Sequence, residues 1–521
     1  TLDEQRGVVQ NEKRQGQNQP YGQVWDEIGK AMYPKGHPYH HSTIGSMNDL
    51  NAASLEDVKT WFRTWYGPNN AVLVLAGDID LATAKEKVAK YFGDIPAGPS
   101  MAQPKIDVAP LSKDSRAEMT DAVPQSRIYR VWNVAEYGQP DLDRLQLFAQ
   151  VLGGGKSSRL DRRLVHQDKL VDNISASAYG SQLGSNFMIV ATVKQGVDVS
   201  KVEAVIDQEV RNLLKDGPEA AELERARTSM QAGWIRGVER IGGFGGKADA
   251  LAECAIYTGD PGCFRESLKT LAAATPATVR EAGVRWLGTG KGSHTQVVNP
   301  GKRQEIPEEA AVTPAPFKLP AADAKYKAMP TGVDRKAGIP VTATFPELKF
   351  PTVQRATLKN GTTVVLAERH DIPVVQMSYE FRGGQAADPA GKPGTASFMT
   401  GLLDEGAGDR DALAFADRAE ELGANLGASA GLDRSTAYLS ALRKNLDASV
   451  ALYADMLRAP RFDQADIDRV KGQWIAGIKQ EKAQPNGIVR RVVPGLVYGA
   501  GHPYAAPATG SGTEAAITSL G

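Results

Sequence analysis

The chain has 521 residues, and its 61 basic and 61 acidic side chains leave a formal net charge of zero. This balance argues against a dedicated binder of nucleic acid or of another polyanion. No apolar run approaches the roughly 20 residues that a membrane-spanning helix needs. The length exceeds what one hydrophobic core organises, which predicts about three domains. Because the chain starts at Thr1 inside one motif and stops at Gly521 inside another, we expect a fragment or a processed piece.

The first predicted element is a helix within residues 5–22. Val8, Val9 and Glu12 are spaced to share one helical face. Gln5 lies two turns before Glu12 on the same side. A glutamate beside two valines is either the solvated edge of an amphipathic face or a ligand held over the core. For a lone glutamate on a helix the solvated edge is the commoner case.

The rest of the first unit alternates helical and strand-like patterns and is expected to end near residue 112. An amphipathic helix would place Leu55, Val58, Phe62 and Trp65 on one apolar face. The predicted helices are 23–32, 55–66 and 81–92, with a buried strand at 70–77. The loop G-H-P-Y-H-H contains three histidines, His37, His40 and His41. We interpret these histidines as loop residues and not as metal ligands, because a proline within the loop breaks any regular helix.

Residues 113–302 are predicted to form a second unit of similar construction. The predicted strands are 125–134 and 186–193, and the predicted helices are 142–152, 159–166, 202–215, 220–241 and 278–287. Ser157 is expected to cap the helix at 159–166, and the glycines between 242 and 246 to form a flexible joint. The run Gly155-Lys156-Ser157 imitates the end of a phosphate-binding loop. We reject nucleotide binding because Gln150 replaces the required glycine and because a helix precedes the run.

The chain has two cysteines, Cys254 and Cys263, which lie nine residues apart around a turn-like G-D-P-G. They could close a disulfide or remain two unpaired thiols. A zinc pair is excluded because no histidine or further cysteine lies nearby in the sequence.

Residues 303–350 are rich in Pro, Ala and Lys and are predicted to be a linker. A third unit, residues 351–521, begins with a hairpin signal at Asn360-Gly361 between two alternating strands. A further strand is predicted at 374–381, and the predicted helices are 396–403, 412–422, 446–457 and 466–482.

The first unit recurs in the third without a gap, at an offset of 465 residues, which is the separation of Gly36 and Gly501. The matching residues include Pro20 with Pro485, Gly22 with Gly487, Tyr33 with Tyr498, the four residues of G-H-P-Y, and Gly45-Ser46 with Gly510-Ser511. So many matches in register predict a duplication. The third unit would then be a second copy of the first, and both would be partial.

These motifs resemble those of the insulinase/pitrilysin family of zinc peptidases, the inverzincins. That family's first metal motif is H-x-x-E-H, and its third ligand is a glutamate on a helix with the pattern R-x-V-V-x-N-E, here Arg6 to Glu12. The likeness extends through Y-P-K-G-H-P-Y, I-G-S and W-Y-G-P-N-N-A-V-L-V-L-A-G-D, and through G-G-G-K-S-S-R-L of the second unit. The resemblance implies an α+β fold of repeated two-layer domains. Each would have a mainly antiparallel sheet covered by helices, and a linker would join two clamshell halves.

The resemblance also implies the site residues. Glu12 would be a zinc ligand, and Gln5 stands where the family often has a supporting acidic residue. No catalytic residue is expected in this chain, because the first copy's H-x-x-E-H would lie before Thr1. None of the seven histidines begins such a motif; they are His37, His40, His41, His166, His294, His370 and His502. In the third unit, the positions of this motif hold Ser397, Thr400 and Gly401, and Gly477 matches Glu12.

The function implied first is a zinc-dependent endopeptidase that cleaves peptides or unfolded polypeptide segments in a closed chamber, with Zn²⁺ as its cofactor. The isolated fragment would be inactive. The alternative is a non-catalytic scaffold or substrate-holding subunit of the same fold. We expect no nucleic-acid partner, a possible homodimer, and a periplasmic or otherwise exported location.

Overall fold

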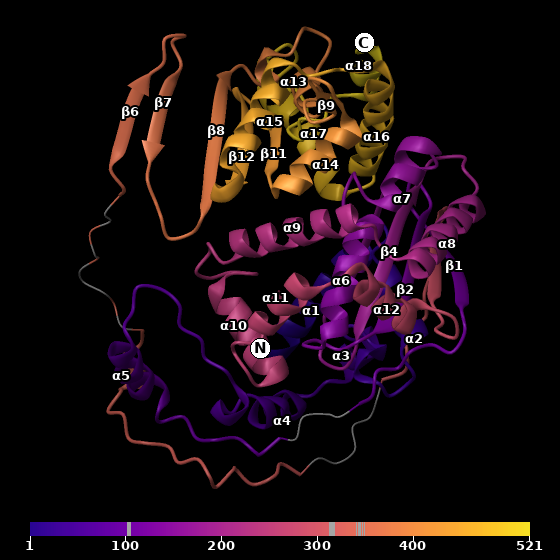
Figure 1. Ribbon diagram of the computed structural model, residues 1–521. Helices are drawn as coiled ribbons and strands as arrows, with labels where there is room; N and C mark the ends of the chain where they lie inside the picture. The colour runs from indigo at the N-terminus through magenta and orange to yellow at the C-terminus, as the bar shows by residue number, and fades with distance from the viewer. Residues whose placement is uncertain (102–105, 312–317, 340, 342–344, 346, 348–349) are drawn as a thin grey trace.

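The computed structural model describes residues 1–521 except 102–105, 312–317, 340, 342–344, 346 and 348–349. Two bodies, each built on its own sheet, lie against each other (Figure 1). Helices α4 (Leu55–Trp65) and α5 (Leu81–Phe92) lie at the bottom of the view, away from the body that carries the C-terminus (Figure 1). Helices and mainly antiparallel sheets in the same bodies confirm the predicted α+β class.

The second unit is built on a five-stranded sheet in the order β1-β5-β2-β4-β3. Only β1 and β5 pair in parallel; the other neighbours are antiparallel. The strands are β1 (Ser115–Asp121), β2 (Arg127–Val134), β3 (Val171–Tyr179), β4 (Ser185–Val193) and β5 (His294–Pro300). Successive side chains alternate between the faces, so Ile128 and Trp132 enter one core and Tyr129 and Val131 enter another.

Helices cover both faces of this sheet. The larger core lies under α6 (Pro140–Gly153), α8 (Val199–Asp216) and α12 (Pro276–Leu287). On the opposite face, α2 (Val24–Met32) of the first unit buries Val24, Ile28 and Met32. The first and second units therefore share a hydrophobic core.

The remaining helices of the second unit are α7 (Arg159–Asp161), which continues into a π-helical turn η3 (Arg162–Gln167), α9 (Ala220–Gly237), α10 (Lys247–Thr258) and α11 (Phe264–Ala273). A disulfide joins Cys254 to Cys263, so the bonded alternative is the one found. The predicted cap is wrong by one residue. Ser158 precedes α7, while the Ser157 hydroxyl donates a hydrogen bond to the Glu420 carboxylate at 2.5 Å.

The regular elements described in the first unit are all helices, joined by irregular segments. It consists of α1 (Leu2–Gln17), α2, η1 (Pro38–His40), α3 (Met47–Ala52), α4 (Leu55–Trp65), η2 (Pro68–Asn70) and α5 (Leu81–Phe92). The buried strand predicted at 70–77 is wrong: the segment pairs with no strand in the described chain, and Leu73 is 52% exposed. The apolar face of α4 is also exposed, with Phe62 at 61%. A strand forms only beside a hydrogen-bonded neighbouring strand, and an apolar helix face is buried only when another element packs against it. Both depend on tertiary structure, which the local sequence does not specify.

The third unit has a separate hairpin and a three-stranded sheet. Its strands are β6 (Val353–Thr357), β7 (Thr363–Ala367), β8 (Val374–Arg382), β9 (Gly406–Ala407), β10 (Arg410–Asp411), β11 (Asn425–Ala430) and β12 (Arg434–Leu442). The sheet order is β11-β12-β8, fully antiparallel, and β6 pairs with β7 as predicted. The helices are α13 (Thr395–Thr400), α14 (Ala412–Leu422), α15 (Leu446–Arg458), α16 (Gln464–Lys482), α17 (Pro485–Tyr498) and α18 (Glu514–Ser519). Short 3₁₀ turns of this unit are η5 (Gln385–Ala387), η6 (Arg443–Asn445) and η7 (Pro503–Ala505), and the preceding linker contains η4 (Arg335–Ala337).

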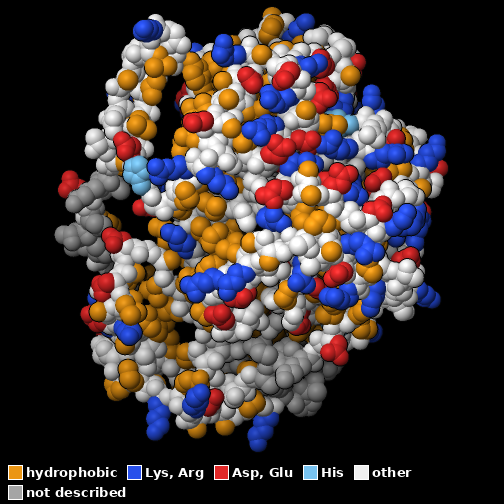
Figure 2. Space-filling view, viewed as in Figure 1, with side chains coloured by type: hydrophobic (Ala, Val, Ile, Leu, Met, Phe, Trp, Pro, Cys, Tyr) orange, Lys and Arg blue, Asp and Glu red, His pale blue; other side chains and the backbone are white. Residues whose placement is uncertain are grey.

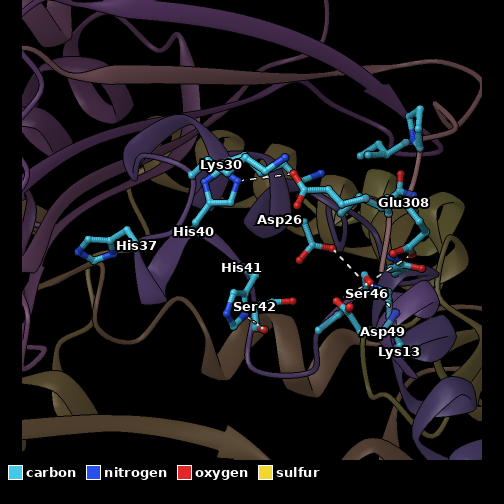
Figure 3. Close-up of a pocket in the computed structure, with 18 of the residues that line it drawn as sticks. Lys13, Asp26, Lys30, His37, His40, His41, Ser42, Ser46, Asp49 and Glu308 are labelled. Atoms are coloured by element: carbon cyan, nitrogen blue, oxygen red, sulfur yellow. Dashed lines mark hydrogen bonds and ion pairs between the residues drawn. The ribbon is translucent and has the colours of Figure 1, made fainter. Parts of the chain in front are cut away.

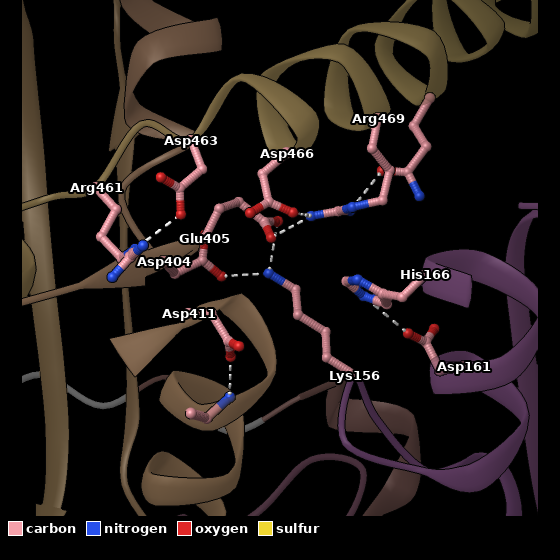
Figure 4. A network of polar contacts seen from close by, with 12 residues as sticks. Lys156, Asp161, His166, Asp404, Glu405, Asp411, Arg461, Asp463, Asp466 and Arg469 are labelled. Carbon is pink, nitrogen blue, oxygen red and sulfur yellow. Dashed lines mark hydrogen bonds and ion pairs between the residues drawn. The ribbon is translucent and has the colours of Figure 1, made fainter. Parts of the chain in front are cut away.

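The second and third units meet where α9 packs against α14 and where a charged network crosses between the bodies (Figure 4). The Lys156 ammonium lies 2.8 Å from carboxylate oxygens of both Asp404 and Glu405. Arg469 of α16 also pairs with Glu405. The lysine that imitates a phosphate-loop residue therefore contacts protein carboxylates.

Charged side chains of both signs are interspersed over the visible face (Figure 2). Among the described residues, no helix is both long and apolar enough to cross a membrane.

Candidate functional site

The two motif segments have the same local geometry. Tyr33 stacks on His37 with ring centroids 4.7 Å apart, and Tyr498 stacks on His502 at 5.0 Å. Each histidine Nδ1 accepts a hydrogen bond from the backbone N–H two residues later, at 3.0 Å in both segments. These histidines therefore cap the 3₁₀ turns η1 and η7, as expected of loop residues.

Gly22 and Gly487 occupy equivalent, sterically closed positions. A Cβ atom on Gly22 would lie 2.1 Å from the carbonyl oxygen of Gly16, and one on Gly487 would lie 2.1 Å from that of Glu481. Only glycine fits such an approach of backbone to backbone.

Helix α1 presents the candidate ligand to solvent. Thr1 and Glu4 form a capping box at its start. The helix is then anchored by polar contacts of one face: the Arg6 guanidinium donates to the carbonyl of Asn51 at 3.1 Å, and Gln10 donates to the Asn51 side chain at 2.6 Å. Because the face of α1 with Arg6 and Gln10 packs against Asn51, the face with Gln5, Val8 and Glu12 points to solvent.

Glu12 and Gln5 are both exposed, and Val8 is 58% exposed. Within the described part of the chain, neither the Glu12 carboxylate nor the Gln5 amide has a hydrogen-bond or ion-pair partner. In this structure the Glu12 carboxylate lies at the exposed edge of the helix, where a cation could reach it.

A buried lysine lies next to Glu12 on the attached side of α1. Lys13 is 5% exposed, and its ammonium donates to the Gly45 carbonyl at 2.8 Å. The carboxylates of Asp26 and Glu308 lie 3.7 Å and 3.5 Å from the same nitrogen. Charge pairing of this kind is what makes a buried lysine tolerable. Sequence reasoning missed Lys13, and no local signal in the sequence marks it.

A cavity of about 350 Å³ lies beside Lys13, between α1, α2, the loop after η1 and linker residues 306–310 (Figure 3). The Glu308 carboxylate accepts the Met47 backbone N–H at 2.9 Å, and the Asn48 side chain donates to the Glu309 carbonyl at 2.7 Å. The ring of His40 lies 3.5 Å from the Glu309 carboxylate. An acidic part of the linker thus docks on the first unit and forms one wall of this cavity.

His37 lines the same cavity but lies apart from the other labelled side chains (Figure 3). Burial, and to a lesser degree the nearby His40, lower the pKa of its imidazole. A neutral ring that caps η1 through Nδ1 agrees with its interpretation as a structural histidine.

The described residues do not complete a metal centre. They contain no group of three or more His, Cys, Asp or Glu side chains that could hold a metal ion. A protein zinc site needs at least three such ligands, and Glu12 stands alone. We therefore assign no catalytic step to the side chains of this chain.

In the third unit, α13 and α16 meet through apolar and aromatic side chains. Phe398 of α13 meets Trp474 of α16 edge to face, with ring centroids 5.6 Å apart. A Cβ atom on Gly401 would lie 3.1 Å from the Trp474 ring, and the buried Thr400 hydroxyl donates to the carbonyl of Ala396 at 3.0 Å.

Ser397 and Gly477, the other two positions of the third unit singled out in the sequence, provide few donor atoms for a cation. Ser397 is partly buried on α13, and Gly477 is exposed with no neighbouring atom within 4 Å of a built Cβ. Ile478, fully buried, takes the register position of Lys13.

Comparison with known proteins gives two matches to models of one peptidase family. The model described as Peptidase M16 inactive domain matches residues 52–230, and the model described as Insulinase (Peptidase family M16) matches residues 363–502.

Two curated relatives come from Helicobacter pylori. Zinc protease PqqE is 27% identical over 249 residues, which are 45% of this chain and 54% of that protein. Non-peptidase homolog YmxG is 24% identical over 198 residues, which are 36% of this chain and 44% of that protein. The chain spans about half the length of the curated relatives that it matches.

A solved structure of a protease from Helicobacter pylori is similar with a TM-score of 0.53 at 22% sequence identity. The match covers 57% of this chain and 71% of that one. At this identity the likeness concerns the fold alone.

Proposed function

Because the chain belongs to the insulinase family of peptidases, M16, we propose that it is part of a zinc-dependent endopeptidase for peptides or unfolded polypeptide segments. In this proposal, residues 1–112 contribute one zinc ligand, and residues 113–302 form a related second domain. Residues 303–350 link these domains to residues 351–521, which are an inactive copy of the first domain.

The observation that carries the proposal is the state of Glu12. Its carboxylate is exposed and has no partner among the described residues, while the opposite face of α1 is fixed by Arg6, Gln10 and Lys13. An unneutralised carboxylate on a fixed helix is suited to bind a cation that other groups bring to it. The remaining ligands and the general base would come from outside the described residues. Bound zinc would supply Lewis-acid chemistry at the substrate.

The third unit would serve as a chamber wall and would hold substrate without metal. Its packed pair of aromatic rings, Phe398 and Trp474, and the side-chain-free position Gly477 support this role. The shared geometry of the two G-H-P-Y segments supports a duplication of the unit.

An exported location is part of the proposal. The disulfide between Cys254 and Cys263 supports it, because disulfides persist mainly in oxidising compartments. A homodimer remains a prediction without a supporting contact.

The second candidate function is a non-catalytic scaffold. It is favoured by the relative named a non-peptidase homolog and by Gln5, an uncharged side chain where the family often has a supporting acid. The two candidates differ in whether the natural protein that contains this sequence holds zinc through Glu12.

The test is Glu12→Gln in that natural protein. A neutral amide is a poorer ligand for a divalent cation than a carboxylate, so we expect weaker zinc binding, loss of most peptidase activity and, for the metal-free protein, an unchanged melting temperature. Zinc content by mass spectrometry and turnover of a mixed peptide library are the measurements.

Glu86→Gln is the matched control, since Glu86 is an exposed helical glutamate of the same unit. Equal zinc content and equal activity in the Glu12 and Glu86 variants would remove Glu12 from the site. A natural protein that holds no zinc would favour the scaffold.

A further inference from the structure

A second cavity, of about 680 Å³, lies in the second unit between α6, α9, α10, α11 and the end of β3. We call it the α9–α11 cavity. Its volume is within the range of sites that bind small ligands or side chains of a peptide. Its lining shares no residue with that of the cavity beside Lys13 and does not include Glu12, and it has no part in the proposed zinc chemistry.

One wall of the α9–α11 cavity is apolar and aromatic. Trp234 of α9 stacks on Phe264 of α11 with ring centroids 5.6 Å apart and an interplanar angle of 23°. Met230 and Leu268 extend this wall. Surfaces of this kind recognise large apolar side chains and cations that stack on aromatic faces.

The polar groups of the cavity are mainly acidic. Asp143, 9% exposed on α6, and Asp249 and Glu253 on α10 line it, with Arg240 as the one cation among the described lining residues. Asp249 already accepts the Gly245 backbone N–H at 2.7 Å. Three carboxylates against one guanidinium leave an excess of negative charge that a bound cation would balance.

A glycine-rich loop with an exposed aromatic tip adjoins the opening. Phe244 is 94% exposed in the run Gly242-Gly243-Phe244-Gly245-Gly246, and Gly245 itself lines the cavity. Gly243 and Gly245 have φ angles of 76° and 73°, which only glycine adopts freely. An aromatic ring on such a hinge is placed to cover an occupant of the cavity.

We propose that the α9–α11 cavity binds a peptide in which a lysine or arginine adjoins a large apolar residue. The basic group would lie at Asp143 and Glu253, and the apolar side chain would lie against Trp234 and Phe264. That the ligand is a peptide rests on the proposed function, whereas its apolar and cationic character rests on the cavity itself. Binding does not require zinc.

The test measures the binding of peptides to the 521-residue chain in the presence of a metal chelator. Binding is detected as a change in tryptophan fluorescence. The probe is acetyl-Leu-Arg-Leu-Arg-amide, and the comparison peptides replace each Arg by Glu or each Leu by Ala. We expect saturable binding of the first peptide, none of the glutamate peptide, and at least tenfold weaker binding of the alanine peptide. The fluorescence change should disappear in Trp234→Phe, which separates this tryptophan from the other six of the seven.

Variants of the cavity complete the test. Asp143→Asn with Glu253→Gln should weaken binding at least tenfold, and Phe244→Ala should weaken it several-fold at an unchanged melting temperature, because Phe244 is exposed. Glu266→Gln is the control, since this glutamate of α11 is 72% exposed and lies outside the cavity lining. Equal binding of the arginine and glutamate peptides, or undiminished affinity in the double variant, would overturn the proposal. Because zinc is absent throughout, these outcomes are independent of whether Glu12 is a ligand.

Discussion

Asp143 is a carboxyl group that the fold holds in an unfavourable environment. Burial raises its pKa to about 6, and the Ser267 hydroxyl and the Arg144 guanidinium oppose this rise. The other ionisable groups that line the surrounding cavity are Tyr137, Tyr179, Asp249, Glu253 and Arg240. Retention of a destabilising group is typical of sites that serve binding, because function and stability compete there.

The stability of the protein should therefore depend on pH through Asp143. An aspartate in an unfolded chain titrates near pH ~4, so folding favours the protonated form. The associated stability is complete below about pH 4 and is lost as the pH rises through about 6. Asp143→Asn should raise the free energy of unfolding at pH 8 by up to about 3 kcal/mol, and should leave it unchanged near pH 4.

Urea unfolding at the two pH values measures this difference. Asp409→Asn is the control, because that side chain is 87% exposed, and it should change neither value. An asparagine variant at position 143 that is less stable at pH 8, or that gains the same amount at both pH values, would contradict the assignment.

Among single residues, the sequence could predict that Glu12 lies on a helix but not what surrounds it. The motif around it identified the helix and the candidate ligand. That Glu12 is free while Lys13 is buried depends on contacts to Gly45 and to Glu308 of the linker, far along the chain. The spacing of residues within one helix does not indicate such long-range contacts.

At the scale of elements, α14 ends in a glycine that sets how closely the third unit approaches the second. Gly423 has a φ of +59°, and a Cβ there would lie 3.0 Å from the Cβ of Ala232 and 3.2 Å from the Thr228 methyl, both on α9. The residue thus serves two purposes: it ends α14 in the left-handed conformation and permits close packing between the bodies.

Gly423→Ala should destabilise the protein through both effects. The left-handed backbone alone accounts for about 1–2 kcal/mol, and crowding against α9 adds roughly 1–3 kcal/mol. Gly391→Ala separates the backbone effect from the crowding effect. Gly391 has a φ of +77°, and a Cβ atom there would have no neighbouring atom within 4 Å. Denaturant unfolding of both variants gives the comparison. Equal losses would show that the contact with α9 contributes nothing.

Elements with strong local signals were predictable, whereas those that depend on neighbours were not. Helix α5 covers Leu81–Phe92, the residues predicted, because the Asp80 cap and the apolar spacing are local. The strand expected at 70–77 is absent because its apolar run finds no partner strand among the described residues. β5 was missed although Val297 and Val298 are fully buried, since it is short and its buried run does not alternate.

At the scale of the whole molecule, the two motif copies have the same shape and different surroundings. The first copy uses α2 to cover the sheet of the second unit. In the third unit, Val489 and Val493 of α17 take the register of Val24 and Ile28 and are 55% and 44% exposed. The α+β class was predictable from the sequence, but how the bodies dock was not. The bodies are joined by the charged contacts of Lys156 and by the packing of α9 on α14. These residues lie far apart in the sequence, so no local pattern predicts that they meet.

The central claim is that only the first copy provides a zinc ligand. Its most direct test is the zinc content per chain of the natural protein that contains this sequence, after exhaustive dialysis. The account predicts one tightly held zinc, lost in Glu12→Gln and retained when Ser397 and Thr400 are both replaced by alanine. Two zinc ions per chain, with the second lost in the third-unit variant, would contradict it.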